Sequence, residues 1–342
     1  MPPTICADCG TQVAPALLAC PACHRLVHAE RLNRLAADAG RAAAAGDLTA
    51  ALAAWREALD LLPADTRQHA TVAATISELS RRLDEGHSAA APSGRKKSLG
   101  KRAAGISALG VLLAKFKFLV VFLLTKAKLL VLGLTKASTL FSMLLSAGVY
   151  WTLWGWKFAV GLVVSIYVHE MGHVQALNRY GIKATAPMFI PGIGAVVRLK
   201  QYPADPREDA RVGLAGPIWG LGAAAAAYAA YLVTRAPVLA GIAHFGAWVN
   251  LFNLLPVWQL DGGRGFRALA RRQRWIAVAV IAATWFATGE GLLALLCVAA
   301  VAAAWFGHAP EEPDAPALWQ YASLVALLGA MTRIPVPVGT TG

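Results

Sequence analysis

A short motif, HEMGH at residues 169–173, directly follows an apolar run, FAVGLVVSIYV at 158–168. Histidines at positions i and i+4 share one face of a helix, so the imidazoles of His169 and His173 can reach one metal ion. The adjacent Glu170 is suited to deprotonate a water molecule at such an ion. A soluble metalloprotease would carry this motif on an amphipathic helix, whereas this helix looks like a membrane span. The pattern therefore indicates metal-assisted hydrolysis within or next to a lipid bilayer.

The composition favours a membrane protein with several spans. Of the 342 residues, 57% are hydrophobic and only 15% are charged, which is too apolar for an ordinary soluble protein. The net charge is +13, but the basic residues cluster beside apolar runs, at 94–102, 198–211 and 264–274. Such clusters are typical of cytoplasmic loops. Because no aromatic residues alternate with these basic residues, we expect no nucleic-acid partner.

The apolar segments predict an all-α polytopic membrane protein. We expect spans near 137–151, 156–178, 212–234, 237–256, 275–289, 290–307 and 317–333. The basic loop 179–211 should be cytoplasmic, and so should the N-terminus, because its first residues do not resemble a signal peptide. An odd number of crossings must then lie between 103 and 151. We predict one crossing, preceded by a lysine-bearing interfacial or re-entrant segment at 103–136, in a bacterial inner or cell membrane.

The N-terminal residues 1–28 contain two cysteine pairs, Cys6-x2-Cys9 and Cys20-x2-Cys23. Two such pairs place four thiolates around one zinc ion, and the spacing resembles a short zinc ribbon. A site closed by four cysteines is structural, since no position is left open for chemistry. The alternatives are a pair of redox dithiols or unrelated buried cysteines.

Residues 29–85 predict a short cytosolic helical segment. Gly46-Asp47 separates a first helix from a second, Pro63 ends the second, and a third helix is expected near 65–84. The pattern resembles the later part of one tetratricopeptide repeat. It predicts either recognition of a cytosolic protein partner or a simple helical spacer. The following residues, 86–102, are rich in Ser, Gly, Pro and charges and predict a linker.

A second motif, NLLPVWQLDGG at 253–263, places Asp261 at the end of a later apolar span. The predicted topology puts Asp261 at the same membrane depth as His169 and His173. A carboxylate is a suitable third zinc ligand and leaves the fourth position open for water. Each motif has a structural alternative: the histidine pair can be structural, and Asp261 can belong to an ordinary Asp-Gly-Gly turn. The apolar setting favours function, because buried histidine and glutamate are costly in a membrane span.

Together the two motifs resemble the site-2 protease family of intramembrane zinc metalloproteases. The resemblance covers roughly 150–270, and the ribbon and the repeat-like helices are an N-terminal extension to it. It implies one catalytic zinc ion held by His169, His173 and Asp261, with Glu170 as the catalytic base and Asn253 at the scissile carbonyl. Asn250 is a second candidate for substrate binding, or else a group that packs helices together. No segment between the motifs reads as a PDZ domain.

The apolar segment 188–200 is expected to form a small β-hairpin near the active site. Its edge could bind an extended substrate by strand addition, which makes Pro191, Gly192 and Gly194 candidate substrate-binding residues. An ordinary connecting hairpin is the alternative. The segment Gly213–Pro217 is expected to open the next span, with the proline in its first turn. The small residues of 216–227 should allow close helix contact.

The sequence therefore predicts a transmembrane metalloprotease domain at 137–336 that cuts single-span membrane proteins in regulated intramembrane proteolysis. Two alternatives stay open. One is a non-proteolytic membrane protein with a structural or regulatory metal site. The other is a cytosolic adaptor that the membrane part anchors to the bilayer.

Overall fold

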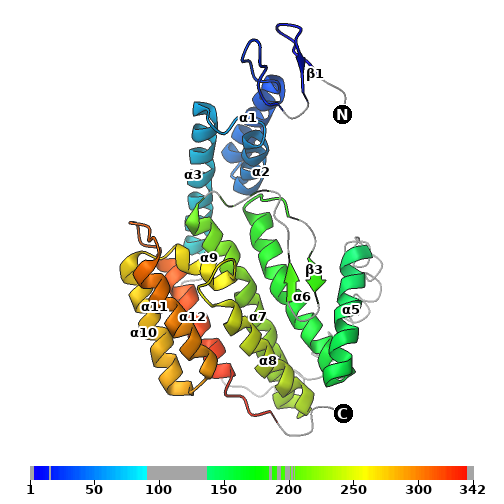
Figure 1. Ribbon diagram of the computed structural model, residues 1–342, viewed down its shortest axis with the longest axis vertical. Coiled ribbons are helices and arrows are strands. Elements are labelled where there is room, and N and C mark those ends of the chain that lie inside the picture. Colours follow the sequence, from blue (N-terminus) through cyan, green and yellow to red (C-terminus); the bar gives the residue numbers. More distant parts are fainter. Residues whose placement is uncertain are drawn as a thin grey trace, which may run out of the picture.

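The computed structural model describes residues 4–14, 17–90, 137–184, 187–190, 194–196, 201, 203 and 205–336. Within these ranges the chain is mostly helical, with two short antiparallel hairpins (Figure 1). The expected helical fold class is confirmed at this level. The lysine-bearing segment 103–136 and most of the expected linker lie outside the described residues.

The N-terminal part contains strands β1 (Thr4–Ile5) and β2 (Gln12–Val13) and helices α1 (Ala29–Ala44), α2 (Leu48–Leu59) and α3 (Arg67–Ala90). The remainder contains helices α5 (Ala137–Trp154), α6 (Trp156–Arg179), α7 (Pro206–Thr234), α8 (Pro237–Asn253), α9 (Asp261–Arg267), α10 (Arg271–Thr288), α11 (Gly291–Phe306) and α12 (Ala315–Met331). Strands β3 (Met188–Ile190) and β4 (Gly194–Val196) pair between α6 and α7 in the chain order.

Helices α1 to α3 form a small unit, which we call the N-terminal helical unit (residues 29–90). Its interior is built from Ala51, Leu52, Ile76 and Leu79. The unit sits on one end of the larger bundle, with the strands β1 and β2 beyond it (Figure 1). Helix α3 extends to Ala90, so the expected linker begins inside a helix. The alanines after Ser88 are strong helix formers, which explains the extension.

In the larger bundle, α7 is the central helix and packs against α6, α8, α9 and α12. A continuous apolar core joins α7 to α12 and includes Leu214, Leu251, Phe266, Ile281 and Tyr321. A smaller cluster around Leu162 and Phe189 joins α5, α6 and β3.

The expected start of the span in α7 was wrong. The helix begins at Pro206, where the side chain of Asp205 accepts a hydrogen bond from the backbone N–H of Glu208. An aspartate cap followed by proline is a strong start signal that the apolar pattern obscured. Pro217 therefore lies inside the helix. There it removes one backbone donor, a loss that a tightly packed helix tolerates.

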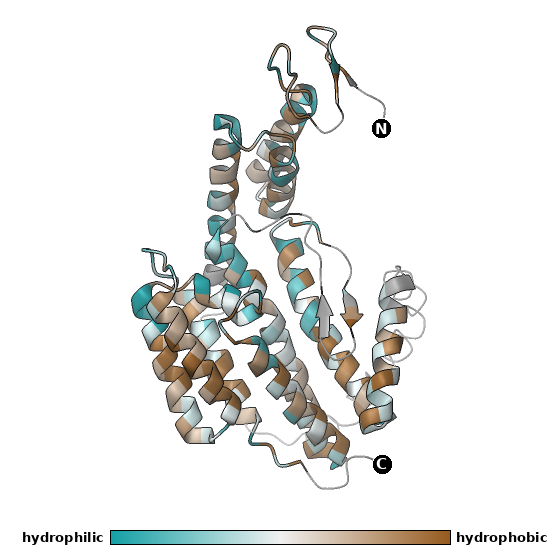
Figure 2. Ribbon diagram, viewed as in Figure 1, coloured by the Kyte–Doolittle hydropathy of each residue, from teal (hydrophilic) through white to brown (hydrophobic). Residues whose placement is uncertain are grey.

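Among the described residues, α7 is the one helix long and apolar enough to cross a membrane, and α11 and α12 are apolar but shorter. Hydrophobic residues also colour the other helices of the bundle, whereas hydrophilic residues gather toward the N-terminal helical unit (Figure 2). Large apolar side chains are exposed on several of these helices, among them Phe141, Val164, Phe286, Val298 and Trp305. The polytopic arrangement stays a prediction.

Candidate metal centre

Three potential metal ligands from two helices meet in the bundle. His169 and His173 lie one turn apart on α6, and their Nε2 atoms are 3.1 Å apart. Asp261, the first residue of α9, places Oδ2 3.1 Å from His169 Nε2 and Oδ1 3.3 Å from His173 Nε2. Both imidazoles are buried, and the Asp261 side chain is only 13% exposed. The structure thus brings together the three ligands expected from the sequence.

The spacing of these atoms suits a zinc ion. Nitrogen and oxygen ligands lie about 2.0–2.1 Å from tetrahedral zinc, so two of them are about 3.3 Å apart. The separations here are 3.1 to 3.3 Å. Two imidazoles and one carboxylate form a donor set typical of catalytic zinc, with the fourth position left for water or substrate. The residues present therefore fit the ion.

Hydrogen bonds on the outer nitrogens hold both imidazoles in one orientation. Nδ1 of His169 is 2.8 Å from Oδ1 of Asn250, and Nδ1 of His173 is 2.8 Å from the carbonyl oxygen of Val212. Because both oxygens are acceptors, each Nδ1 carries the proton and donates it. Each Nε2 then directs its lone pair toward the centre.

The two asparagines of α8 occupy different environments. Asn250 is buried and bonded to His169, and its Nδ2 donates to the carbonyl of Gly246 at 2.7 Å. Its amide is therefore fixed as an orienting group for a ligand, a role that the sequence did not reveal. Asn253 is the last residue of α8 and is partly exposed. Contact of either asparagine with substrate stays a prediction.

The backbone of α7 forms one wall of the centre at Gly216. A Cβ atom added there would lie 2.2 Å from His173 Nε2 and 2.7 Å from His169 Nε2. Any side chain would thus occupy the space of the ligands, which explains a glycine at this position. Gly216 is one of the small residues expected to permit helix contact, and here it permits close contact with the imidazoles. Glu170, beside His169 on α6, is buried with 7% of its surface exposed.

Comparison with known proteins identifies this part of the chain. Residues 157–246, which include the HEMGH motif, match the model of Peptidase family M50. The chain contains an M50 domain. The resemblance to site-2 proteases is thereby confirmed for this segment, which ends before Asp261.

Several curated relatives are named as zinc metalloproteases. Zinc metalloprotease MJ0392 of Methanocaldococcus jannaschii is 28% identical over 117 residues, which cover 33% of this chain and 34% of the relative. Putative zinc metalloprotease Rip3 of Mycobacterium tuberculosis is 32% identical over 215 residues, covering 55% of this chain and 54% of the relative. Probable zinc metalloprotease EGY2, chloroplastic, of Arabidopsis thaliana is 38% identical over 58 residues, covering 16% and 10%. The chain thus spans about half or less of these relatives. No solved structure matches it.

Close to the candidate metal centre, two arginines join α9 to α7. Arg264 Nε donates to Asp209 Oδ1 at 2.8 Å, and Arg267 Nη2 donates to Asp209 Oδ2 at 3.1 Å. Since Asp261 is the first residue of α9, this ion-pair cluster helps to fix its position relative to α6 and α7. This ion-pair cluster was not expected from the sequence. The available signal was an arginine one helical turn after Asp261.

The expected hairpin is present beside the M50 helices. In it, Phe189 pairs with Ala195 and Ile190 with Gly194, and β3 contacts α5 while β4 contacts α6. The backbone N–H of Phe189 donates to Ser142 Oγ at 3.1 Å, which fixes β3 to α5. Pro191 and Gly192 lie outside the described residues. Substrate binding along this hairpin stays a prediction.

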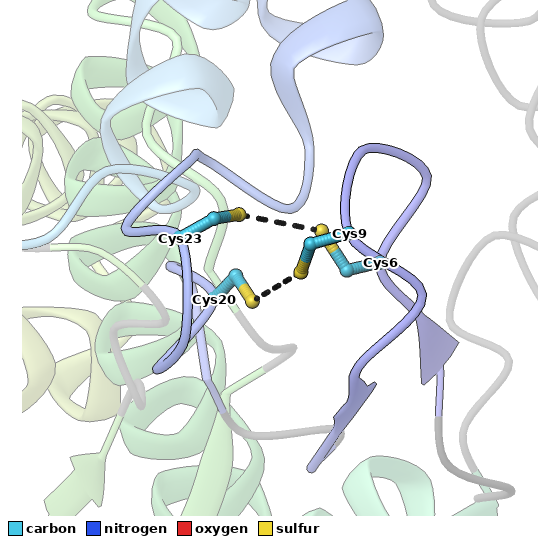
Figure 3. A group of neighbouring side chains, drawn as sticks. All are labelled: Cys6, Cys9, Cys20 and Cys23. Atoms are coloured by element: carbon cyan, nitrogen blue, oxygen red, sulfur yellow. Dashed lines mark hydrogen bonds between the residues drawn. The ribbon is translucent and has the colours of Figure 1, made fainter.

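A second group of potential ligands lies in the N-terminal segment (Figure 3). The Sγ atoms of Cys6 and Cys23 are 3.7 Å apart, and those of Cys9 and Cys20 are 3.5 Å apart. Four sulfur ligands at about 2.3 Å from tetrahedral zinc would be about 3.8 Å apart. The four cysteines therefore fit a structural zinc ion.

Asn250→Ala is expected to weaken metal binding by about 10- to 100-fold, because His169 loses its orienting acceptor. Titration with Co²⁺ of the full chain that carries Cys20→Ser/Cys23→Ser, followed by visible absorption, measures this change at the histidine site alone. Asn253→Ala provides the matched control on the same helix and should keep metal affinity near that of the wild type. Metal binding that is unchanged in Asn250→Ala, or weakened only in Asn253→Ala, would contradict the orienting role of Asn250.

Proposed function

We propose that the chain is an intramembrane zinc endopeptidase that hydrolyses peptide bonds of single-span membrane proteins. The observation that carries this proposal is the convergence of His169, His173 and Asp261 beside the buried Glu170, with both histidines in the segment that matches Peptidase family M50. The three ligands would hold the zinc ion. When bound, zinc acidifies a water molecule and polarises the scissile carbonyl.

The side chains of this chain would divide the remaining work. Glu170 takes a proton from the attacking water and later gives a proton to the leaving amine nitrogen, so hydrolysis yields one carboxylic acid and one amine. Asn250 and the Val212 carbonyl keep both histidines in the tautomer that directs Nε2 inward. The amide of Asn253 would donate to the oxygen of the scissile carbonyl as charge develops there.

The exposed aromatic residues support the proposal that a lipid bilayer surrounds the bundle. Trp151 and Trp156 are exposed near the junction of α5 and α6. Trp275 and Trp305 are exposed near the junction of α9 and α10 and the end of α11, where they contact each other. Tryptophan is enriched where membrane spans meet water. Basic residues at 264–274 lie close to the second pair, which favours a cytoplasmic location for that end and for the N-terminus.

Reconstitution of the full chain in liposomes with candidate single-span membrane proteins tests the proposal. We expect wild type to produce fragments cut within or next to the span, as identified by mass spectrometry. Asp261→Ala should produce none, because the metal loses its carboxylate ligand. Equal cleavage by both proteins, or none by wild type across a broad panel of candidates, would contradict the proposal.

We further propose that the four N-terminal cysteines bind a structural zinc ion. Purified wild type should then contain two zinc ions per chain by elemental analysis, one in each ligand group. The double variant Cys20→Ser/Cys23→Ser should contain one. An unchanged zinc content in that variant would contradict this site, and disulfide bonds in the wild type would favour the redox alternative.

A further inference from the structure

The N-terminal helical unit holds the end of the helix that carries both histidines. Thr49 donates to the carbonyl of Arg179 at 3.1 Å, and Arg56 Nε donates to the carbonyl of Tyr180 at 2.9 Å. The Tyr180 hydroxyl donates to Asp84 Oδ1 at 2.5 Å. Burial, together with the nearby Asp84 carboxylate, raises the pKa of Tyr180 above its ordinary value, so the phenol keeps the proton it donates.

The turn after α6 fits closely against the same unit. Gly181 has a φ of +66°, and a Cβ atom added to it would lie 2.6 Å from the backbone nitrogen of Ala53 on α2. A side chain at this position would therefore be strained and would also push α2 away. Next to the turn, Lys183 Nζ forms an ion pair with Glu57 at 3.0 Å.

The unit also holds the start of α7. Arg56 forms an ion pair with Glu208, and the two side chains are 3% and 1% exposed. Ser80 Oγ donates to the same carboxylate at 3.3 Å, and Arg211 lies 3.6 Å from Asp84. A buried ion pair is a poor source of net stability, but it tolerates few alternative arrangements. The pair therefore fixes α2 to α7 in one register.

The helical unit thus contacts both the end of α6 and the start of α7. The hydrogen bond from His173 to the carbonyl of Val212 joins these same two helices. Val212 is fully buried in a cluster with Leu177, Tyr180 and Ile182, and Leu83 of α3 packs against this cluster. The neighbouring Arg211 forms ion pairs with Asp314 at 2.7 Å and with Asp84 at 3.6 Å. The backbone group that orients a proposed zinc ligand is thus packed in part by the N-terminal helical unit.

We infer that the N-terminal helical unit positions His173 through Val212, and so sets the metal affinity of the M50 domain. Leu83 and Asp84 are the positioning residues, since they act on His173 through the Val212 cluster and through the end of α6, where Tyr180 donates to Asp84. By thermodynamic linkage, a partner that binds the helical unit more tightly when the unit is docked on α6 and α7 than when it is displaced would change this metal affinity. The inference rests on the metal centre of the proposed function, but not on peptide hydrolysis.

Leu83→Ala and Leu79→Ala form a matched pair one turn apart on α3. Leu79 belongs to the interior of the helical unit, whereas Leu83 also reaches the Val212 cluster. Both variants are made in the full chain that carries Cys20→Ser/Cys23→Ser, so that Co²⁺ reports on the M50 site alone. We expect Leu83→Ala to weaken Co²⁺ binding by about 3- to 30-fold, and Leu79→Ala to leave it near the reference value.

Asp84→Asn gives a second test if Leu83→Ala does not fold, because it removes charge with little change in shape. It should weaken Co²⁺ binding in the same direction, with the thermal unfolding temperature recorded for each variant. Unchanged affinity in Asp84→Asn and Leu83→Ala would overturn the inference. Equal weakening in Leu83→Ala and Leu79→Ala would also overturn it, because stability of the unit alone would explain the result. These affinities decide the inference whether or not the chain cleaves any membrane protein.

Discussion

Glu170→Gln is expected to lower the rate constant of peptide hydrolysis by about 10²- to 10⁴-fold. The amide has nearly the same shape as the carboxylate but cannot accept the proton of the attacking water. Glu170 is not one of the three converging ligands, so Co²⁺ binding should stay near that of the wild type. Single-turnover cleavage in liposomes measures the rate, and Co²⁺ absorption of the same variant in the Cys20→Ser/Cys23→Ser chain measures the histidine site alone.

Glu311→Gln is a suitable control for this prediction, because Glu311 is exposed in the loop before α12. It should cleave like wild type. If Glu170→Gln retained full activity with its metal bound, Glu170 would not be the base. A non-proteolytic role for the metal site would then be favoured.

Gly216→Ala is expected to weaken metal binding at the M50 site by about 100-fold or more. Its Cβ would lie 2.2 Å from His173 Nε2, which is too short for two non-bonded atoms unless one of them moves. Either the imidazoles leave their positions or α7 moves away from α6, and both changes separate the ligands. Losses of about 10- to 100-fold follow even when only an orienting partner of a ligand is removed.

Gly222→Ala lies on the same helix and is the matched control. A Cβ atom there would meet no atom within 4 Å, so alanine should be tolerated. The two variants are compared directly for folding and helix content. Co²⁺ titration of the two variants, both in the Cys20→Ser/Cys23→Ser chain, separates a local clash from a general effect of alanine in α7. Normal metal binding in Gly216→Ala would contradict the geometry of the centre.

The convergence of the three proposed metal ligands could be predicted from the sequence because their arrangement follows simple rules. An i, i+4 spacing fixes His169 and His173 on one helix face, and matching membrane depth pointed to Asp261. The orienting acceptor of His173 could not be found this way. It is the backbone carbonyl of Val212. Because every residue has a backbone carbonyl, the residue type at this position gives no sign of the role.

The attachment of the N-terminal helical unit was equally beyond prediction. Arg56 and Glu208 belong to segments far apart in the chain, and a charged residue in an amphipathic helix ordinarily faces water. Only the packing of α2 against the start of α7 buries the pair. The start of α7 was a different case, since Asp205 and Pro206 marked it and the stronger apolar signal further along outweighed them.

Zinc titration of the metal-free enzyme tests the central claim most directly. The Cys20→Ser/Cys23→Ser chain is stripped with a chelator, returned to liposomes with a cleaved membrane protein, and titrated with Zn²⁺ while cleavage is measured. We expect no cleavage without zinc, and recovery that is complete at one ion per chain. The same chain with Asp261→Ala should not recover at that ratio. Cleavage without zinc, or equal recovery with Asp261→Ala, would contradict a zinc peptidase built on His169, His173 and Asp261.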